Sequence, residues 1–477
     1  MRTLIQARYV VAYRDGGHRI LEHGHVVIEG NAIVYVGRDY RGPVDARLDG
    51  SRQLLTPGLI SVHAHLTNSP LTKSLLEDRG NPLHYFSNLY EYLNVTDTTP
   101  EDGLLAARAS LVELLKSGVT TVVELGSLVP DGIVGLAGEL GIRAYIVPTY
   151  RSGHWSSPDG RRVVWAWRED GGRPGLERNV EFIRKHDGAH GGRIRSFLGP
   201  AQIDTCTPEL LRRTAELAES LDVPVQIHAA QSVVEFQEIT RRHGKTPVEL
   251  LAEVGLLGPR LIIGHCIYVS GHPEARYPSG RDLELLAASG ASVAHCPWVF
   301  ARRGAAMHSY PRYLRAGVNV ALGTDTFPQD LLHEMRCAAV LGKLVEGDPR
   351  VATAADVFAS ATLAGARALR RDDLGRIAPG ARADLLLFDL ETLGMAPVRD
   401  PVRNLVFSAT RQDLDTVIVD GRTVVTGGRV AGIDEARLAR DLQAAAERLW
   451  PKIPERDWAK RRVEEISPPS FPEWRDA

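Results

Sequence analysis

Histidine and aspartate side chains follow a series of short apolar segments in this sequence, at the points where each segment turns polar. They are His63, His65, His228, His265, His295 and Asp325. Side chains two positions apart point to the same side of a strand, so His63 and His65 are expected to lie together. Imidazoles combined with a carboxylate suit zinc, and also cobalt, iron or manganese. The set therefore predicts a site for one divalent metal ion, most simply zinc.

The predicted metal ligands are His63, His65, His228 and Asp325, because each ends its own apolar strand or shares the His-Ala-His end of the first one. Three histidines and one aspartate leave room for a water molecule, whose pKa a bound metal lowers to about 7. His265 is expected to polarise the substrate or to handle a proton. For His295, a structural hydrogen-bonding role is an equally good interpretation.

The apolar segments alternate with helical stretches about eight times between residues 57 and 371. This alternation is typical of an α/β fold, the (β/α)8 TIM barrel, in which catalytic groups stand at the C-terminal ends of the strands. Residues 1–56 and 372–430 are instead rich in short strands separated by Gly and Asn turns. We expect both ends to form one small β-sandwich, followed by a helix and tail over 431–477.

The overall composition indicates an ordinary globular protein. Its net charge is −2 over 477 residues, with no long basic run, so we expect neither nucleic acid nor a membrane as a partner. No stretch reaches the roughly 18 apolar residues of a membrane span, and the N-terminus lacks a signal-peptide core. Four cysteines without a CxxC pair argue against a disulfide framework. We expect a cytoplasmic enzyme that acts on a small molecule as a homo-oligomer, a dimer or higher.

The motifs TPGLISVHAH, IHAA, IIGHC, VAHCP and LGTDT stand in an order that resembles the amidohydrolase superfamily. They are similar to its cytosine deaminase and chlorohydrolase-like branch, with triazine, phenylurea and thiocarbamate hydrolases as relatives, over residues 1–430. The resemblance implies that Asp325 also takes the proton from the metal-bound water, and that His265 faces the carbonyl or leaving group of the substrate. Binuclear members carry a bridging lysine after strand four. Here that segment reads RIRSFLGPAQID, which favours one metal.

The sequence departs from the deaminases of this branch at Gln231, where they place a proton-carrying glutamate three residues after the strand-five histidine. An amide can form hydrogen bonds but cannot carry that proton. Glu235 could substitute from one helical turn away. We therefore expect hydrolysis of an amide-like C–N bond, in a urea, carbamate, thiocarbamate or anilide that is partly apolar. The alternatives are a deaminase or dechlorinase of a triazine- or pyrimidine-like ring, and a metal-containing binding protein, which an open metal position argues against.

Aromatic residues in the loops around the expected barrel mouth suit an apolar or aromatic ligand. The expected substrate contacts, besides Gln231, are Tyr85, His154, Trp155 and Trp298. Glu124, at the end of the second strand, is interpreted as a pocket or hydrogen-bonding residue more than as an extra ligand. The pair Arg302 and Arg303 could meet an anion, but paired loop arginines are usually solvated, and we expect the same here.

Overall fold

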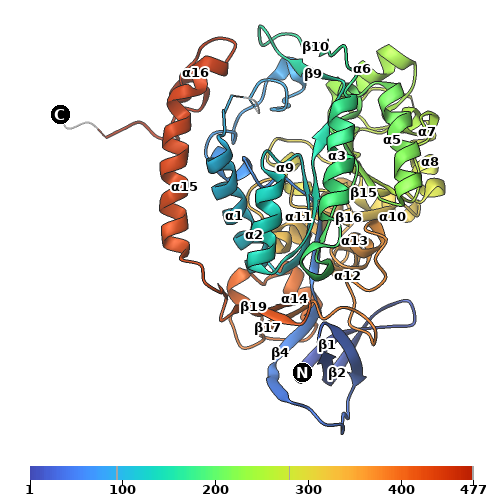
Figure 1. Cartoon of the computed structure of the whole chain (residues 1–477), viewed down its shortest axis with the longest axis vertical. Coiled ribbons are helices and arrows are strands. Elements are labelled where there is room, and N and C mark those ends of the chain that lie inside the picture. The colour runs from blue at the N-terminus through green and yellow to red at the C-terminus, as the bar shows by residue number, and fades with distance from the viewer. Residues whose placement is uncertain (93–94, 279, 475–477) are drawn as a thin grey trace.

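The computed structural model describes residues 1–477 except 93–94, 279 and 475–477. A (β/α)8 barrel occupies the middle of the molecule, and a β-structure built from both ends of the chain lies against one end of it (Figure 1). This confirms the predicted fold class. Among the described residues, no helix is long and apolar enough to cross a membrane.

The barrel wall consists of parallel strands whose residues are almost all buried. They are β5 (Leu59–Ala64), β6 (Val119–Leu125), β7 (Arg143–Val147), the two short strands β11 (Ile194–Arg195) and β12 (Gly199–Pro200), β13 (Val225–Ala229), β14 (Leu261–His265), β15 (Ser292–His295) and β16 (Asn319–Leu322). They pair in the orders β11-β7-β6-β5 and β13-β14-β15-β16. Single bridges from Leu198 to Val225 and from Ala64 to Asp325 join these two sheets into a ring.

The fourth strand is shorter than expected. Within the segment RIRSFLGPAQID, expected to hold the fourth strand, β11 and β12 are separate, and β12 pairs with β8 (Thr149–Tyr150). Between them the Ser196 hydroxyl donates a hydrogen bond to Ile146 O at 2.6 Å. A side chain thus makes a contact between the fourth and third strands at the point where the regular ladder stops.

Helices surround the barrel, and several begin at a Thr-Pro pair. The helices are α1 (Pro100–Lys116), α2 (Pro130–Leu140), α3 (Arg173–His186), α4 (Ala189–Gly192), α5 (Pro208–Leu221), α6 (Val233–His243), α7 (Pro247–Glu253), α8 (Asp282–Ser289), α9 (Pro297–Ala301), α10 (Tyr310–Arg315), α11 (Leu331–Glu346), α12 (Ala354–Ser360) and α13 (Leu363–Ala368). Thr99, Thr207 and Thr246 each accept a hydrogen bond from a backbone N–H of the first turn. The following proline has no N–H that would need such a partner, which explains why the pair is a good helix start.

The strands from the two ends of the chain share one eight-stranded sheet, in the order β20-β19-β18-β17-β4-β1-β2-β3. Their bounds are β1 (Arg2–Arg14), β2 (Gly17–Glu29), β3 (Ala32–Gly37), β4 (Ala46–Pro57), β17 (Leu385–Asp389), β18 (Leu414–Val419), β19 (Arg422–Thr426) and β20 (Arg429–Val430). The antiparallel pairing of β4 with β17 joins the two halves. The sheet has its own apolar core, which includes Ile5, Val26 and Leu385.

Two sets of polar contacts attach the remaining parts to the barrel. Arg143 of β7, 1% exposed, pairs with Asp384 and Asp420 of the end-built sheet.

The last helices are α14 (Pro401–Phe407), α15 (Glu435–Leu449), α16 (Ile453–Arg456) and α17 (Val463–Ile466). Helix α15 runs beside α1, where Arg448 pairs with Asp102 (Figure 1).

Candidate metal centre and cavity

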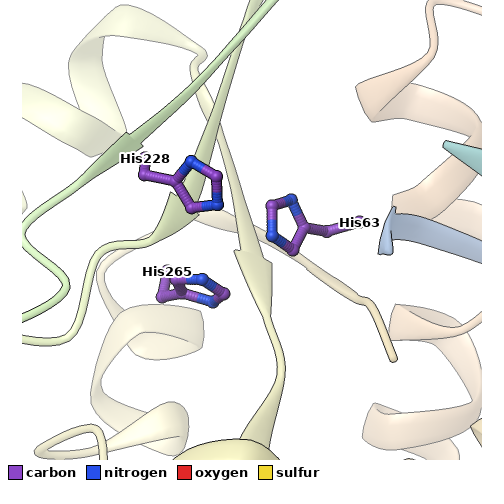
Figure 2. A group of neighbouring side chains, drawn as sticks. All are labelled: His63, His228 and His265. Atoms are coloured by element: carbon purple, nitrogen blue, oxygen red, sulfur yellow. The ribbon is translucent and has the colours of Figure 1, made fainter. Parts of the chain in front are cut away.

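The predicted metal ligands come together at the carboxyl ends of the barrel strands. His63 lies on β5, His228 on β13 and His265 on β14, and Asp325 follows β16. Figure 2 shows that the rings of His63, His228 and His265 point toward one another. The ring centre of His63 is 4.9 Å from that of His228 and 4.8 Å from that of His265. Gly264 makes this approach possible, because a Cβ there would lie 3.2 Å from the His63 ring.

The ligand-type atoms of this cluster are close enough to share one ion. The Nε2 atoms of His65 and His228 are 3.2 Å apart. Asp325 Oδ1 lies 3.6 Å from His63 Nε2 and 3.4 Å from His65 Nε2, and its Oδ2 lies 4.0 Å from His265 Nε2. Two groups that share His63 have ligand atoms within 4.8 Å of one another. One group adds His228 and His265, and the other adds His65 and Asp325. The structure therefore brings His265 as close as the four predicted ligands.

Backbone carbonyls orient two of the histidines. The Nδ1–H group of His65 donates to Leu125 O at 2.6 Å, and that of His228 donates to Ala201 O at 2.7 Å. A carbonyl can only accept, so each ring must carry its proton on Nδ1 and present an Nε2 lone pair to the cluster. Both ring nitrogens of the fully buried His63 lack a hydrogen-bond partner among the described residues. These are the properties of ligands that suit a divalent cation.

Burial and proximity set the charges of the cluster. Burial lowers the pKa of His65 and of His228, and it lowers the pKa of His265 to about 3. Burial alone would raise the pKa of Asp325, but the neighbouring His265, His63 and His65 hold that pKa well below its usual value. At neutral pH His65, His228 and His265 are thus neutral imidazoles and Asp325 is a carboxylate, the donor types that zinc prefers.

His295 and Glu124 lie near the cluster but have other contacts. The His295 ring stacks on Tyr310 at 5.6 Å, and burial lowers its pKa to about 3. Glu124 is fully buried, and its Oε2 accepts a hydrogen bond from Leu66 N at 2.8 Å. Glu124 therefore fixes the backbone directly after His65.

A cavity of about 620 Å³ borders this cluster of histidines, with His65 and His228 in its wall. The expected contacts His154 and Trp155 also line it, and the Trp155 indole donates to Gln202 Oε1 at 2.9 Å. Three other expected substrate residues, Gln231, Trp298 and Tyr85, are not among the lining residues. Of the five expected substrate contacts, only His154 and Trp155 therefore line this cavity among the described residues.

Those three side chains make other contacts. The Trp298 ring packs edge-on against His333 at 4.5 Å. The Tyr85 hydroxyl accepts from Gln237 Nε2 at 2.8 Å, and 43% of the residue is exposed. Gln231 is 7% exposed, and its Nε2 has no partner among the described residues.

Glu235, the possible substitute proton carrier, is fully buried at the start of α6 and does not line the cavity. Its Oε1 accepts from Ala230 N, which ties α6 to the end of β13. Burial, and then the nearby Asp204, raise its pKa well above the usual value. In this arrangement Glu235 supports the turn that follows His228.

The arginine pair is placed differently from the sequence interpretation. Arg302 and Arg303, expected to be solvated, are both half-buried and line the cavity. They directly follow the short helix α9, which ends at Ala301. Gln202 also lines the cavity and was not singled out from the sequence. Neither strand periodicity nor motif spacing reports how such a loop folds back.

Comparison with known proteins gives relatives that span almost the whole chain. A 5'-deoxyadenosine deaminase of Methanothermobacter thermautotrophicus is 32% identical over 434 residues, covering 90% of this chain and 95% of the relative. A 5-methylthioadenosine/S-adenosylhomocysteine deaminase of Desulforudis audaxviator is 31% identical, covering 94% and 99%.

Solved structures share the fold. A zinc-bound adenosine deaminase from Xanthomonas campestris has a TM-score of 0.80 at 25% identity, with 94% of this chain and 98% of that one covered. A zinc complex of atrazine chlorohydrolase from Arthrobacter aurescens has a TM-score of 0.80 at 24% identity, covering 93% and 100%. The model of the amidohydrolase family matches residues 54–424. With most of its length matched in this way, the chain belongs to the amidohydrolase family.

Proposed function

We propose that this protein is a metal-dependent hydrolase that displaces an amino group, or a similar leaving group, from a carbon of a heteroaromatic ring. The convergence of neutral imidazoles and one ionised carboxylate beneath a cavity carries the hydrolase assignment. The names of the relatives favour the ring reaction over the amide-like hydrolysis that Gln231 led us to expect, because they are purine nucleoside deaminases.

The proposed cofactor is one divalent ion, with zinc as the first choice, held by His63, His65, His228 and Asp325. Bound there, it would lower the pKa of a coordinated water to about 7 and so make hydroxide available at neutral pH. The strand-four segment RIRSFLGPAQID has no lysine that could bridge a second ion. Zinc in two of the solved relatives supports this choice of metal.

Asp325 and His265 are the proposed proton carriers. The Asp325 carboxylate is ionised and stands within reach of the ligand atoms, so it can accept a proton from water. His265 Nε2 is 4.0 Å from Asp325 Oδ2 and can hydrogen-bond to a ring nitrogen or a leaving group. Because the Gln231 amide cannot carry a proton, the reaction would depend on these two residues.

A second candidate is hydrolysis of a urea, carbamate, thiocarbamate or anilide, and Gln231 is the observation that favours it. Among the described residues that line the cavity, the one carboxylate is Asp97, which pairs with Arg456. An acyl C–N cleavage needs only carbonyl polarisation and one proton for the departing amine. Under this candidate, Gln231→Ala would raise KM more than it lowers kcat.

Product analysis separates the two candidates. The zinc-loaded enzyme is incubated with aminated purine nucleosides and triazines, and in parallel with phenylureas, carbamates and anilides. We expect one ammonia per ring turned over, together with the hydroxylated ring. Release of an organic amine from the acyl substrates, without ammonia from any ring, would refute the ring proposal and establish the second candidate. Ligand binding without turnover of any compound would favour a binding protein.

Metal analysis tests the proposed ligand set. We expect about one zinc per chain in the wild type, with activity lost to a chelator and restored by zinc. His228→Ala should lose most of the metal and the activity, whereas the control His190→Ala, at an exposed position, should keep both. Two tightly held ions per active chain would contradict the mononuclear site. The homo-oligomeric state and cytoplasmic location stay predictions, which sedimentation and cell fractionation would test.

A further inference from the structure

Arg303 is a half-buried cation that lines the cavity and has no partner among the residues that the structure describes. Its side chain forms no hydrogen bond or ion pair with the described residues, and its Nε is buried. Its neighbour Arg302 differs, because it donates to Phe327 O at 3.2 Å and to Thr326 Oγ1 at 3.0 Å. Arg302 also lies 4.2 Å over the Phe327 ring. The fold therefore anchors one guanidinium and leaves the other free beside the metal cluster.

The charges around Arg303 do not neutralise it. Burial, together with the neighbouring Arg302, lowers the pKa of Arg303 to about 10, so the group stays protonated at neutral pH. The acidic groups that act on Arg303 are Asp325 and Glu77, and neither carboxylate lies within ion-pair distance of its guanidinium. Asp325 is moreover a proposed metal ligand, so its charge is shared with the ion. A half-buried guanidinium without a counter-ion is unfavourable unless a bound anion pairs with it.

The position of the pair fits a role in substrate binding. Arg302 contacts Thr326, the residue directly after Asp325, so the arginine pair borders the metal cluster on the side of β15 and β16. Of the other cavity arginines, Arg456 is paired with Asp97 and Arg151 is exposed. Among the described arginines of the cavity, Arg303 is thus the half-buried one with neither an ion pair nor a side-chain hydrogen bond.

We propose that Arg303, supported by Arg302, binds an anionic group of the substrate, a carboxylate or a phosphate. The planar guanidinium can bind two oxygens of either group side by side. This inference rests on the proposed function for the identity of the reacting ring, but it concerns a separate part of the substrate. It restricts the substrates to small molecules that carry an anionic group and fit, together with the reacting ring, inside the cavity.

Equilibrium binding to the zinc-loaded protein tests this inference without turnover. The probes are benzoate and phenyl phosphate, with uncharged benzamide as the matched neutral compound, measured by calorimetry at constant ionic strength. We expect the wild type to bind at least one anion, and Arg303→Met to weaken that binding by about 10- to 100-fold, the range for a lost charge-assisted hydrogen-bond pair. Benzamide binding should change less than about twofold by the same reasoning. Loss confined to benzoate or to phenyl phosphate identifies the anion.

Control variants keep the outcome clear. Arg281→Met removes the same charge from an exposed position and should leave anion binding unchanged. Arg303→Met should keep its zinc and unfold at or above the wild-type temperature, since it removes an unpaired buried charge. Should Arg303→Met lose its zinc, Arg303→Gln replaces it in the same assay.

Three results would overturn the inference. In the first, neither anion binds the wild type. In the second, the anions bind Arg303→Met with the same affinity as the wild type. In the third, they bind Glu77→Gln but not the wild type. The last result would mean that Glu77 pairs with Arg303 in solution. None of the probes carries an aminated ring, so the binding assay does not depend on the ring reaction. If the protein binds these anions but releases no ammonia in the product analysis, only the ring proposal is refuted.

Discussion

His18 provides a pH-dependent link between the end-built sheet and the barrel. It lies on β2, and its Nε2 is 2.9 Å from the hydroxyl of Thr362, which itself donates to Phe358 O. The hydroxyl must therefore accept from His18, which leaves Nδ1 unprotonated, buried and without a partner among the described residues. Burial first, and then the positive charge of Arg376, lower the pKa of His18 to about 4.

The shift converts into a stability change of known sign. The folded protein keeps His18 neutral down to about pH 4, whereas the unfolded chain takes up the proton near its usual value of 6.5. The stabilisation is therefore complete above the unfolded pKa and is lost as the pH falls from about 6.5 through 4. The full shift is worth about 3 kcal/mol, of which about 2 kcal/mol is lost by pH 5.

Urea unfolding at about pH 7.5 and pH 5 measures the contribution of His18 to the free energy of unfolding. Between the two values, the wild type should lose about 2 kcal/mol more unfolding free energy than His18→Gln, whose amide can still donate to Thr362 but does not titrate. The other histidines are common to both proteins, so their contributions cancel. His23→Gln, at an exposed position of the same strand, should follow the wild type. If His18→Gln and the wild type lose the same amount, the assigned environment of His18 is wrong.

Three other parts of the structure can each be tested by one change. Arg143→Met leaves two buried carboxylates without their cation and should lower the unfolding free energy by about 3–5 kcal/mol in urea titrations; a loss below about 1 kcal/mol would contradict a buried network. Deleting residues 433–477 removes Arg456 from the cavity wall and should raise KM at least several-fold with zinc retained, whereas an unchanged KM would show that the tail does not shape the cavity. Glu124→Gln keeps an acceptor for Leu66 N and should retain about one zinc per chain, so metal loss would identify Glu124 as a ligand.

The site residues at the strand ends could be predicted from the sequence alone. Strands are local and their side chains alternate, so the His-Ala-His end of β5 and the strand ends at His228 and Asp325 could be predicted to face one site. Their actual distances required the closed barrel, which also brought in His265. The aromatic loops were harder, because only His154 and Trp155 among the expected contacts line the cavity.

The sequence by itself determined the alternation of strands and helices, the ligand types and the departure at Gln231, because these depend on residue identity and short-range periodicity. Only the tertiary structure decided that Arg303 lines the cavity without a partner among the described residues, that Glu235 lies buried away from the cavity, and that Arg143 joins barrel and sheet. Each of these depends on contacts between segments far apart in the chain. Burial and the availability of a partner, which set the energy of a charge, are properties of that packing and leave no local pattern in the sequence.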